Sequence, residues 1–554
     1  MTVLKPIASS RCSWVMMYRR VETLSSATLN TQTLTLKKLH IVKKASLIGG
    51  FFVAVQLLLT SCGREDHSDK MVFRYNEPAG IPTLDPAFAR DKSTIWAVGQ
   101  LYEGLFALNE NNEVVPALAQ YYEVEHSTYS FFLREAYFHS GRRITASDVA
   151  YSFNRLVDPA VASPGAWVLE RVKNIVAVSD TILHIELHEP FAAFPSLLTM
   201  PYCAVVDSVA ANAGKLATEA GGSGPFKFHK WHFGEKLILH KNENYWRHDN
   251  NGRSLPYLDG VSVSFLPDQQ SAFLEYLVGS FDLLPNIDPS FKDDLLTADG
   301  AMQERYREGH ILERSPFLNT EFLLFNAEAE VPYELRWAIN AGIDRVQMMK
   351  LLRSGIGRPA SGGIVPFGLP GHNEHVGIEY QPDSVKALLE SIDELPELTL
   401  TTVANYRDVC EFVQGSLGQL GWSIAVDIVP SATLRSEKSA GTLDFFRASW
   451  IADYPDAENY ALLFASSMKA PAGPNYSRYS NPEYDSLYEQ LVAATADSIK
   501  MDLAGKADAL LMRDAACVPL YYDEVVRVYP KGTKGLKTNA LNALLLNEVI
   551  LPQK

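Results

Sequence analysis

Residues 138–153, FHSGRRITASDVAYSF, contain a helix start whose position can be predicted from the residues alone. Thr145 and Asp148 have the spacing of a variant capping box, in which a hydroxyl residue at the N-cap precedes an acid by three positions. We expect the helix to end at Asp158-Pro159, because proline restricts the residue before it. The apolar residues expected on its buried face are Val149, Phe153, Leu156 and Val157.

Strand and helix patterns alternate on either side of this helix. Residues 182–188 and 261–265 alternate apolar and polar side chains, which predicts half-buried strands. A second helix is expected from Pro332. Its apolar stripe consists of Leu335, Ile339, Gly342, Ile343 and Val346. We expect tight turns with positive φ at Gly141 and Gly224. Because no long linker separates these elements, the chain is expected to be an α/β protein whose domains exchange segments.

The amino-terminal part of the chain has the pattern of an export signal. Four lysines between positions 37 and 44 precede a mostly apolar run at residues 45–60, which is shorter than the roughly 20 residues of a membrane-spanning helix. Leu59-Thr60-Ser61-Cys62 resembles a bacterial lipobox, which implies that Cys62 is lipidated and begins the mature protein. We expect a signal segment at 1–61 and a tether at 62–70. The alternative is a short anchor helix beside an ordinary cysteine.

The composition argues against several classes of function. The chain has 65 acidic and 50 basic residues, a net charge of −15, and eight of the basic residues precede position 62. Such an acidic body does not favour a nucleic-acid partner. Beyond Cys62 the cysteines are Cys203, Cys410 and Cys517, without CxxC or mixed Cys/His spacing. We therefore expect no metal site and no cofactor. By default we expect the three cysteines to be buried free thiols. The alternative is that two of them form one disulfide.

Short motifs follow one another in a fixed order over residues 71–554. They are Pro82-Thr83-Leu84-Asp85-Pro86, Tyr102-Glu103-Gly104-Leu105, Val115-Pro116-Ala117-Leu118-Ala119, the stretch at 138–153, Gly222-Ser223-Gly224-Pro225-Phe226, Asn244-Tyr245-Trp246, Leu335-Arg336-Trp337-Ala338-Ile339 and Asn481-Pro482-Glu483-Tyr484-Asp485. Each motif is weak alone. Together they resemble the solute-binding lipoproteins of ABC importers, specifically the oligopeptide and dipeptide class, bacterial extracellular solute-binding protein family 5.

The resemblance implies a bilobal periplasmic-binding-protein-like clamshell of the class II type with an additional inserted domain. Lobe I would comprise residues 71–105, 224–320 and 526–554, the inserted domain 106–223, and lobe II 321–525. A monomer of this kind would bind a short peptide between its lobes and deliver it to an ABC permease with its ATPase subunits. It would work on the periplasmic side of the cell envelope as a membrane-anchored lipoprotein, and would not be an enzyme.

The resemblance places the ligand site at residues 446–454. In oligopeptide binders the matching strand supplies an aspartate that pairs with the α-ammonium group of the ligand, and Asp453 occupies that position. The desolvation of a carboxylate in a closing cleft would be offset by this cation. The backbone of Trp450, Ile451 and Ala452 would bind the peptide main chain as an added strand. The alternative interpretation makes Asp453 a turn residue.

Two further cationic residues are assigned by the same resemblance. Arg447 would hold the C-terminal carboxylate of a short peptide, a role suited to the planar guanidinium. Lys92 aligns with a family stretch whose backbone touches the peptide. The alternatives are a surface charge at Arg447 and a solvated loop lysine at Lys92. Tyr245 and Trp246 are expected to pack in a core.

Other ligands and one enzyme class stay open. Proteins of this class with similar frames carry nickel complexes, sugars or opines, and Ser449 stands where peptide-binding members often have glycine. Ser466-Ser467-Met468-Lys469 matches the SxxK pattern of penicillin-recognising acyl enzymes, but the chain has no KTG or SDN partner motif. No catalytic residue is therefore assigned.

Overall fold

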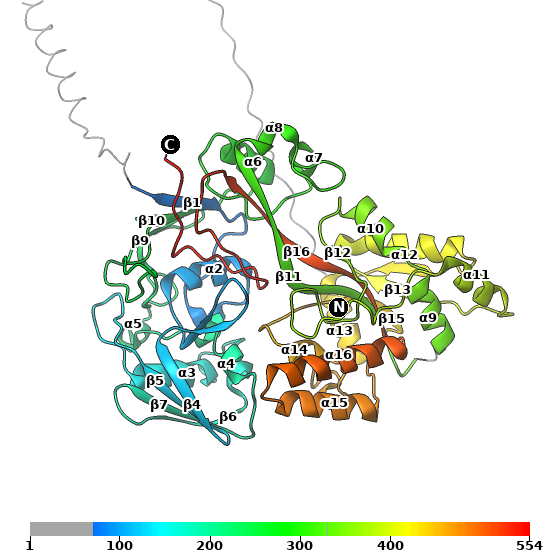
Figure 1. Cartoon of the computed structure of the whole chain (residues 1–554), viewed down its shortest axis with the longest axis horizontal. Helices are drawn as coiled ribbons and strands as arrows, with labels where there is room; N and C mark the ends of the chain where they lie inside the picture. Colours follow the sequence, from blue (N-terminus) through cyan, green and yellow to red (C-terminus); the bar gives the residue numbers. More distant parts are fainter. Residues whose placement is uncertain (1–69, 330, 554) are drawn as a thin grey trace, which may run out of the picture. The chain divides into compact units, whose positions relative to one another are not determined.

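The largest sheet is built around two long antiparallel strands, β11 and β16 (Figure 1). The structure, a computed structural model, describes residues 70–329 and 331–553. The predicted signal segment, Cys62 and nearly all of the tether lie outside these residues. The strand order of this six-stranded sheet is β12 (Arg358–Pro359), β16 (Cys517–Pro530), β11 (His310–Phe325), β15 (Phe445–Ile451), β13 (Thr399–Thr402) and β14 (Ala425–Ile428).

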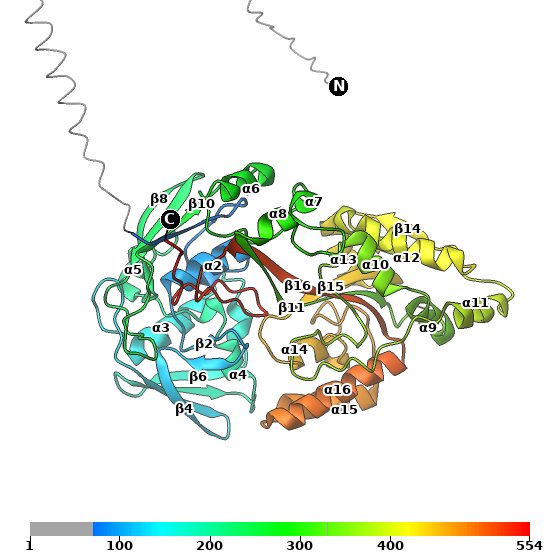
Figure 2. The ribbon, with the colours of Figure 1, turned by 45° about the horizontal axis from the view of Figure 1, so that its top comes forward.

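Helices cover both faces of this sheet. Successive residues of β11 point to opposite sides, and the apolar side chains on each side pack against a different set of helices. Phe322 and Leu324 belong to an apolar cluster with the helices α14 (Glu458–Ala461), α15 (Pro482–Ala493) and α16 (Asp497–Arg513). Leu323 and Phe325 belong to another cluster, with α9 (Tyr333–Ala341), α10 (Arg345–Leu352), α11 (Pro382–Glu390) and α12 (Arg407–Gln419). Figure 2 shows α12 and α16 on opposite sides of the long strands. The end of the strand, residues 322–325, is therefore a continuous apolar run instead of alternating.

The second predicted helix is two helices in the structure. α9 ends at its C-cap Gly342, and Asp344 caps α10 by accepting a hydrogen bond from the backbone N–H of Gln347. The new cap restarts the helical phase. Leu335, Ile339 and Ile343 are buried as expected, but the prediction for Val346 is wrong, since this residue is 68% exposed.

Three smaller sheets are formed by strands between residues 72 and 264. The first has the order β1 (Val72–Asn76), β10 (Gly260–Ser264), β9 (Lys236–Lys241) and β8 (Phe226–His232). The second has the order β4 (Ala119–Glu125), β5 (Thr128–Leu133), β7 (Ile182–Leu187) and β6 (Val172–Ala177), and β2 (Phe106–Leu108) pairs with β3 (Val114–Pro116). β7 and β10 confirm the two strands predicted from alternation.

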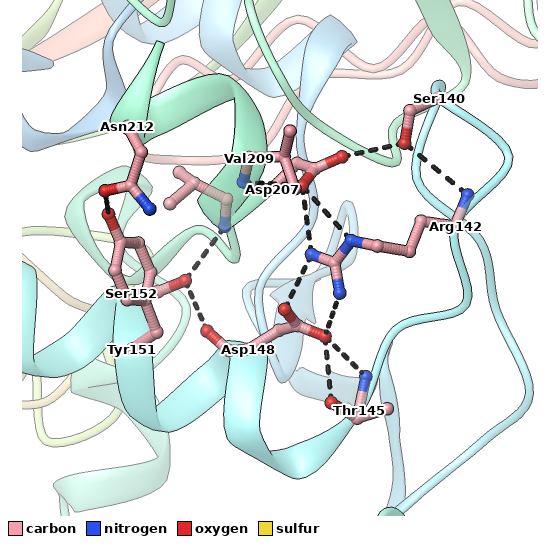
Figure 3. A network of polar contacts seen from close by, with 10 residues as sticks. Ser140, Arg142, Thr145, Asp148, Tyr151, Ser152, Asp207, Val209 and Asn212 are labelled. Carbon is pink, nitrogen blue, oxygen red and sulfur yellow. Dashed lines mark hydrogen bonds and ion pairs between the residues drawn. The ribbon is translucent and has the colours of Figure 1, made fainter. Parts of the chain in front are cut away.

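The predicted capping box forms at the start of α3 (Ala146–Val157). Asp148 accepts hydrogen bonds from the backbone N–H and the hydroxyl of Thr145, both at 2.9 Å. Figure 3 shows that the guanidinium of Arg142 lies between Asp148 and Asp207. This network ties the helix start to the chain some 60 residues later, a contact that the local pattern does not reveal. Val157, predicted to be buried, is 42% exposed, because it lies about 80° around the helix from Val149 at 100° per residue.

The two positions predicted to be turn glycines require glycine for different reasons. Gly141 has φ +85°, as expected for a tight turn. Gly224 does not have a positive φ, so that part of the prediction is wrong. A Cβ at Gly224 would lie 2.6 Å from the carbonyl carbon of Leu101 and 2.7 Å from the carbonyl oxygen of Gln100. Glycine is needed there for close backbone packing against the end of α2 (Lys92–Leu101).

The remaining helices are short and connect these sheets. They are η2 (Pro86–Phe88), η3 (Ala166–Leu169), α4 (Phe194–Leu197), η4 (Pro201–Cys203), α5 (Ser208–Asn212), α6 (Gln269–Leu277), α7 (Lys292–Leu295), α8 (Glu304–Arg307), η5 (Ala404–Tyr406), α13 (Ser431–Ala440) and η6 (Ser466–Met468). Among the residues that the structure describes, no helix has the length and apolar character needed to cross a membrane.

Candidate ligand-binding site

A cavity of about 770 Å³ brings together parts of the chain that are far apart in sequence. Its lining includes residues around the start of α2, residues 199–202, residues 451–453 and much of 535–548. The volume is in the range of small-molecule sites, roughly 300–1,000 Å³. Four residues of the predicted site line it, namely Lys92, Ile451, Ala452 and Asp453. Arg447 and Trp450 are not among its lining residues.

Asp453 follows the end of β15 and presents its side chain to the cavity. Its backbone N–H donates to Oδ1 of Asn459 at 3.0 Å, and the same oxygen accepts the indole N–H of Trp450 at 2.9 Å. Asn459 is itself buried, so it fixes the turn. The side chain of Asp453 is exposed to the cavity, yet the surrounding walls desolvate it and raise its pKa, with a smaller opposing effect from Asn459. This carboxylate would gain from a cationic partner.

One edge of β15 beside this carboxylate is open. The N–H of Ala452 donates to the carbonyl of Leu318 on the β11 side, at 2.8 Å. Successive residues of a strand direct their backbone N–H and C=O groups to opposite edges. Ser449 and Ile451 therefore direct these groups away from β11. There, among the described residues, β13 pairs with β15 only at Phe445 and Phe446. Of the predicted segment 450–452, the open edge therefore offers the backbone of Ile451 but not that of Trp450 or Ala452.

Arg447 is held by another residue of the sheet. Its Nε donates to Oε2 of Glu321 at 2.9 Å, and its Nη2 bonds to the same oxygen. The guanidinium also lies 3.4 Å from the ring centre of Tyr406. The two charged side chains are 11% and 3% exposed, so Arg447 is not a surface charge. Burial raises the pKa of Glu321, and Arg447 opposes this rise. The ligand role of Arg447 stays a prediction, and its guanidinium already has a carboxylate partner.

Lys92 is the first residue of α2 rather than a solvated loop lysine. Its ammonium lies 3.0 Å from Oε2 of the buried Glu77 and 4.7 Å from the ring centre of Trp96. Asp91 caps the helix by accepting from the N–H of Thr94 at 3.0 Å. Glu77 therefore neutralises the charge of Lys92 at the cavity wall. The contact between the backbone of Lys92 and a ligand stays a prediction.

A buried carboxylate, Glu103, joins two of the sequence motifs. It accepts the Tyr245 hydroxyl on Oε1 and the Trp246 indole N–H on Oε2, both at 2.6 Å. Burial raises the pKa of Glu103, and the nearby Arg247 opposes this. Tyr245 is buried, as expected, but it and Glu103 also line the cavity. Sequence reasoning missed this role because the contact spans 142 residues.

The SxxK residues do not form a nucleophile–base pair. The Ser466 hydroxyl donates to Oδ2 of Asp485 at 2.6 Å, and the Lys469 ammonium lies 3.9 Å from Oε1 of Glu328. A serine nucleophile needs a base that accepts its proton. Cys203, Cys410 and Cys517 are buried free thiols, as predicted by default. Within the described residues, no three His, Cys, Asp or Glu side chains group as metal ligands.

Comparison with known proteins identifies the family of this chain and its fold. Residues 113–471 match the bacterial extracellular solute-binding proteins, family 5, and the chain belongs to this family. It is 28% identical to the periplasmic murein peptide-binding protein MppA of Escherichia coli K12, over 84% of this chain and 89% of that protein. It is 24% identical to the dipeptide-binding protein DppE of Bacillus subtilis, over 83% and 88% of the two chains.

A solved structure has the same fold. The periplasmic binding protein DppA of Helicobacter pylori, associated with an ABC transporter and in complex with the peptide STSA, superposes with a TM-score of 0.69. The match is 24% identical and covers 86% of this chain and 98% of that one. The predicted α/β fold of the periplasmic binding proteins is thereby confirmed.

Proposed function

We propose that this chain is the solute-binding component of an ABC importer and that it captures short peptides with a free amino terminus. The observation that carries the proposal is Asp453, a carboxylate without an ion pair among the described residues, on the wall of a cavity and beside an open strand edge. The ligand ammonium would bind this carboxylate, and the ligand backbone would pair with Ile451. The relatives named for murein peptides and dipeptides support this ligand class.

The delivery of the ligand follows from the same proposal. The protein would act on the periplasmic side of the envelope, anchored through a lipid on Cys62, and would pass peptide to a permease driven by a separate ATPase. Lobe I (71–105, 224–320 and 526–554) and lobe II (321–525) would close on the ligand, with 106–223 as the inserted domain. A ligand that contacts both lobes favours the closed state by its differential affinity.

The carboxylate of Asp453 can be removed without changing the size of its side chain. We expect Asp453→Asn to weaken binding of trialanine about 10- to 100-fold in titration calorimetry, since a charged hydrogen bond contributes roughly 1.5–3 kcal/mol. N-acetyl-trialanine should bind the original protein equally weakly. Asp427→Asn is the matched control, because that carboxylate is exposed and does not line the cavity. Equal affinity of the variant and of both peptides would reject the anchor.

The same anchor predicts a pH dependence of binding. Burial raises the pKa of Asp453, and only the ionised carboxylate binds an ammonium group, so binding releases a proton as the pH approaches this pKa from above. Affinity for trialanine should be constant from about pH 7, where the peptide α-amino group (pKa about 7.7–8.0) is mostly charged, down to the raised pKa of Asp453, and fall about tenfold per pH unit below it. Calorimetry from pH 7 downward measures this, and Asp453→Asn should remove the decline. A decline of the same size in the variant would assign it to another group.

A further inference from the structure

The charges on the cavity wall are mostly neutralised within the protein. Eight charged side chains line the cavity, and six of them have an ion-pair partner. The six paired side chains are Lys92, Glu103, Glu110, Arg247, Lys537 and Glu548. Lys92 is paired with Glu77 at 3.0 Å, and Arg247 with Glu103 at 3.9 Å. Lys537 lies 3.0 Å from Glu110 and 3.3 Å from Glu548.

Two charges of opposite sign remain, Asp453 and Arg90. Across the described residues, the guanidinium of Arg90 has neither an ion pair nor an aromatic ring beneath it, and the side chain is exposed. Both residues line the cavity together with Tyr202. The pKa of Tyr202 is raised first by burial and then by Asp453, and lowered by Arg90. The two charges without an ion pair therefore lie on the wall of one cavity, which they share with Tyr202.

The backbone on both sides of Arg90 is fixed. The N–H of Arg90 donates to the carbonyl of Phe88 at 2.9 Å, directly after η2, whose N-cap Asp85 forms an ion pair with Arg155. Asp91, the next residue, caps α2. The guanidinium thus extends from a held backbone, and its planar donors match the two oxygens of a carboxylate.

We propose that Arg90 binds a carboxylate of the ligand, so that the cavity takes a zwitterion with its ammonium group on Asp453 and its carboxylate on Arg90. This inference rests on the proposed peptide function and specifies its second anchor. It replaces Arg447 in that role, because Arg447 is paired with Glu321 and does not line the cavity. The carboxylate is either the C-terminus of a short peptide or an acidic side chain near its amino terminus.

The test compares free and blocked carboxylates on the whole protein. Di-, tri- and tetra-alanine are titrated as free acids and as C-terminal amides, together with Ala-Glu-Ala amide, into the original protein, Arg90→Gln, Arg90→Lys and Arg143→Gln. Arg143→Gln is the matched control, since it makes the same substitution at an exposed arginine that does not line the cavity. Circular dichroism and thermal unfolding establish that all variants are folded.

We expect the original protein to bind at least one free acid about 10- to 100-fold more tightly than its amide. Arg90→Gln should lose this preference, Arg90→Lys should keep part of it, and Arg143→Gln should keep all of it. The original protein can also prefer Ala-Glu-Ala amide over trialanine amide. If Arg90→Gln abolishes that preference, the result supports the proposal and assigns the bound carboxylate to the glutamate side chain of the peptide. Unchanged preferences in Arg90→Gln would overturn the inference, while sensitivity to N-acetylation would still support peptide binding. No binding of any peptide to the original protein would reject the peptide function and this inference with it.

Discussion

Replacing Gly224 by alanine is expected to cost about 3 kcal/mol or more of folding free energy. The new Cβ would lie 2.6–2.7 Å from backbone atoms of Gln100, Leu101 and Tyr102 at the end of α2, and backbone atoms cannot rotate away as a side chain can. A Cβ at Gly222 would lie even closer, 2.0 Å from the carbonyl oxygen of Leu101. Urea unfolding followed by circular dichroism measures the loss.

A glycine elsewhere in the chain provides the matched control. Gly415 lies in the exposed part of α12, where an added Cβ meets no atom within 4 Å. Gly415→Ala should stabilise the protein by up to about 1 kcal/mol through helix propensity. If Gly224→Ala were as stable as the original protein, the close packing between this loop and α2 would not exist in solution. Because α2 begins with the cavity residue Lys92, partial displacement of this helix should also weaken ligand binding.

Replacing Arg447 by alanine is expected to cost about 3–5 kcal/mol, since it leaves the buried carboxylate of Glu321 without its partner. The loss should become smaller at acidic pH. Burial already raises the pKa of Glu321, and without Arg447 its pKa should rise further. A group with a raised folded-state pKa lowers stability as the pH rises through that pKa. Urea unfolding at pH 5 and pH 8 measures the difference.

Two further variants distinguish the loss of the buried ion pair from the loss of a positive charge at any position. Arg513→Ala removes an arginine from the exposed pair with Glu483, whose side chains are 60% and 61% exposed, and should cost less than about 1 kcal/mol. The double variant Glu321→Gln, Arg447→Gln should be more stable than Arg447→Ala, because no unpaired charge stays buried. If Arg447→Ala remained stable but lost its preference for a free peptide carboxylate, Arg447 would be the ligand residue that the family resemblance predicts.

Arg447 and Arg90 carry the same positive charge but lie in different environments. Arg447 lies on a central strand, where Glu321 of the neighbouring β11, opposite Ser449 in the register, forms a diagonal ion pair with it. Arg90 lies in a connection at the cavity wall, where no acid is paired with it among the described residues. Residue type and position along the chain do not distinguish these environments. The availability of each charge depends on which residues the folded chain brings next to it.

Local sequence patterns predicted the elements that depend on neighbouring residues. The capping box at Thr145, the strands β7 and β10 and the positive φ of Gly141 are all confirmed. Their physical causes act over a few residues, through a backbone cap, an alternating face or a turn. The helix from Pro332 was predicted too long because a second cap at Asp344 restarts it.

The family also followed from the sequence, since its ordered motifs are visible in one dimension, and three residues of the segment predicted to bind the ligand, 451–453, line the cavity. Only the tertiary structure decided which charges are free. Ion pairs such as Arg447 with Glu321 join residues 126 positions apart, and Glu103 contacts Tyr245 across 142. The energy of a buried charge depends on the atoms around it, and those atoms come from segments that meet only when the chain is folded.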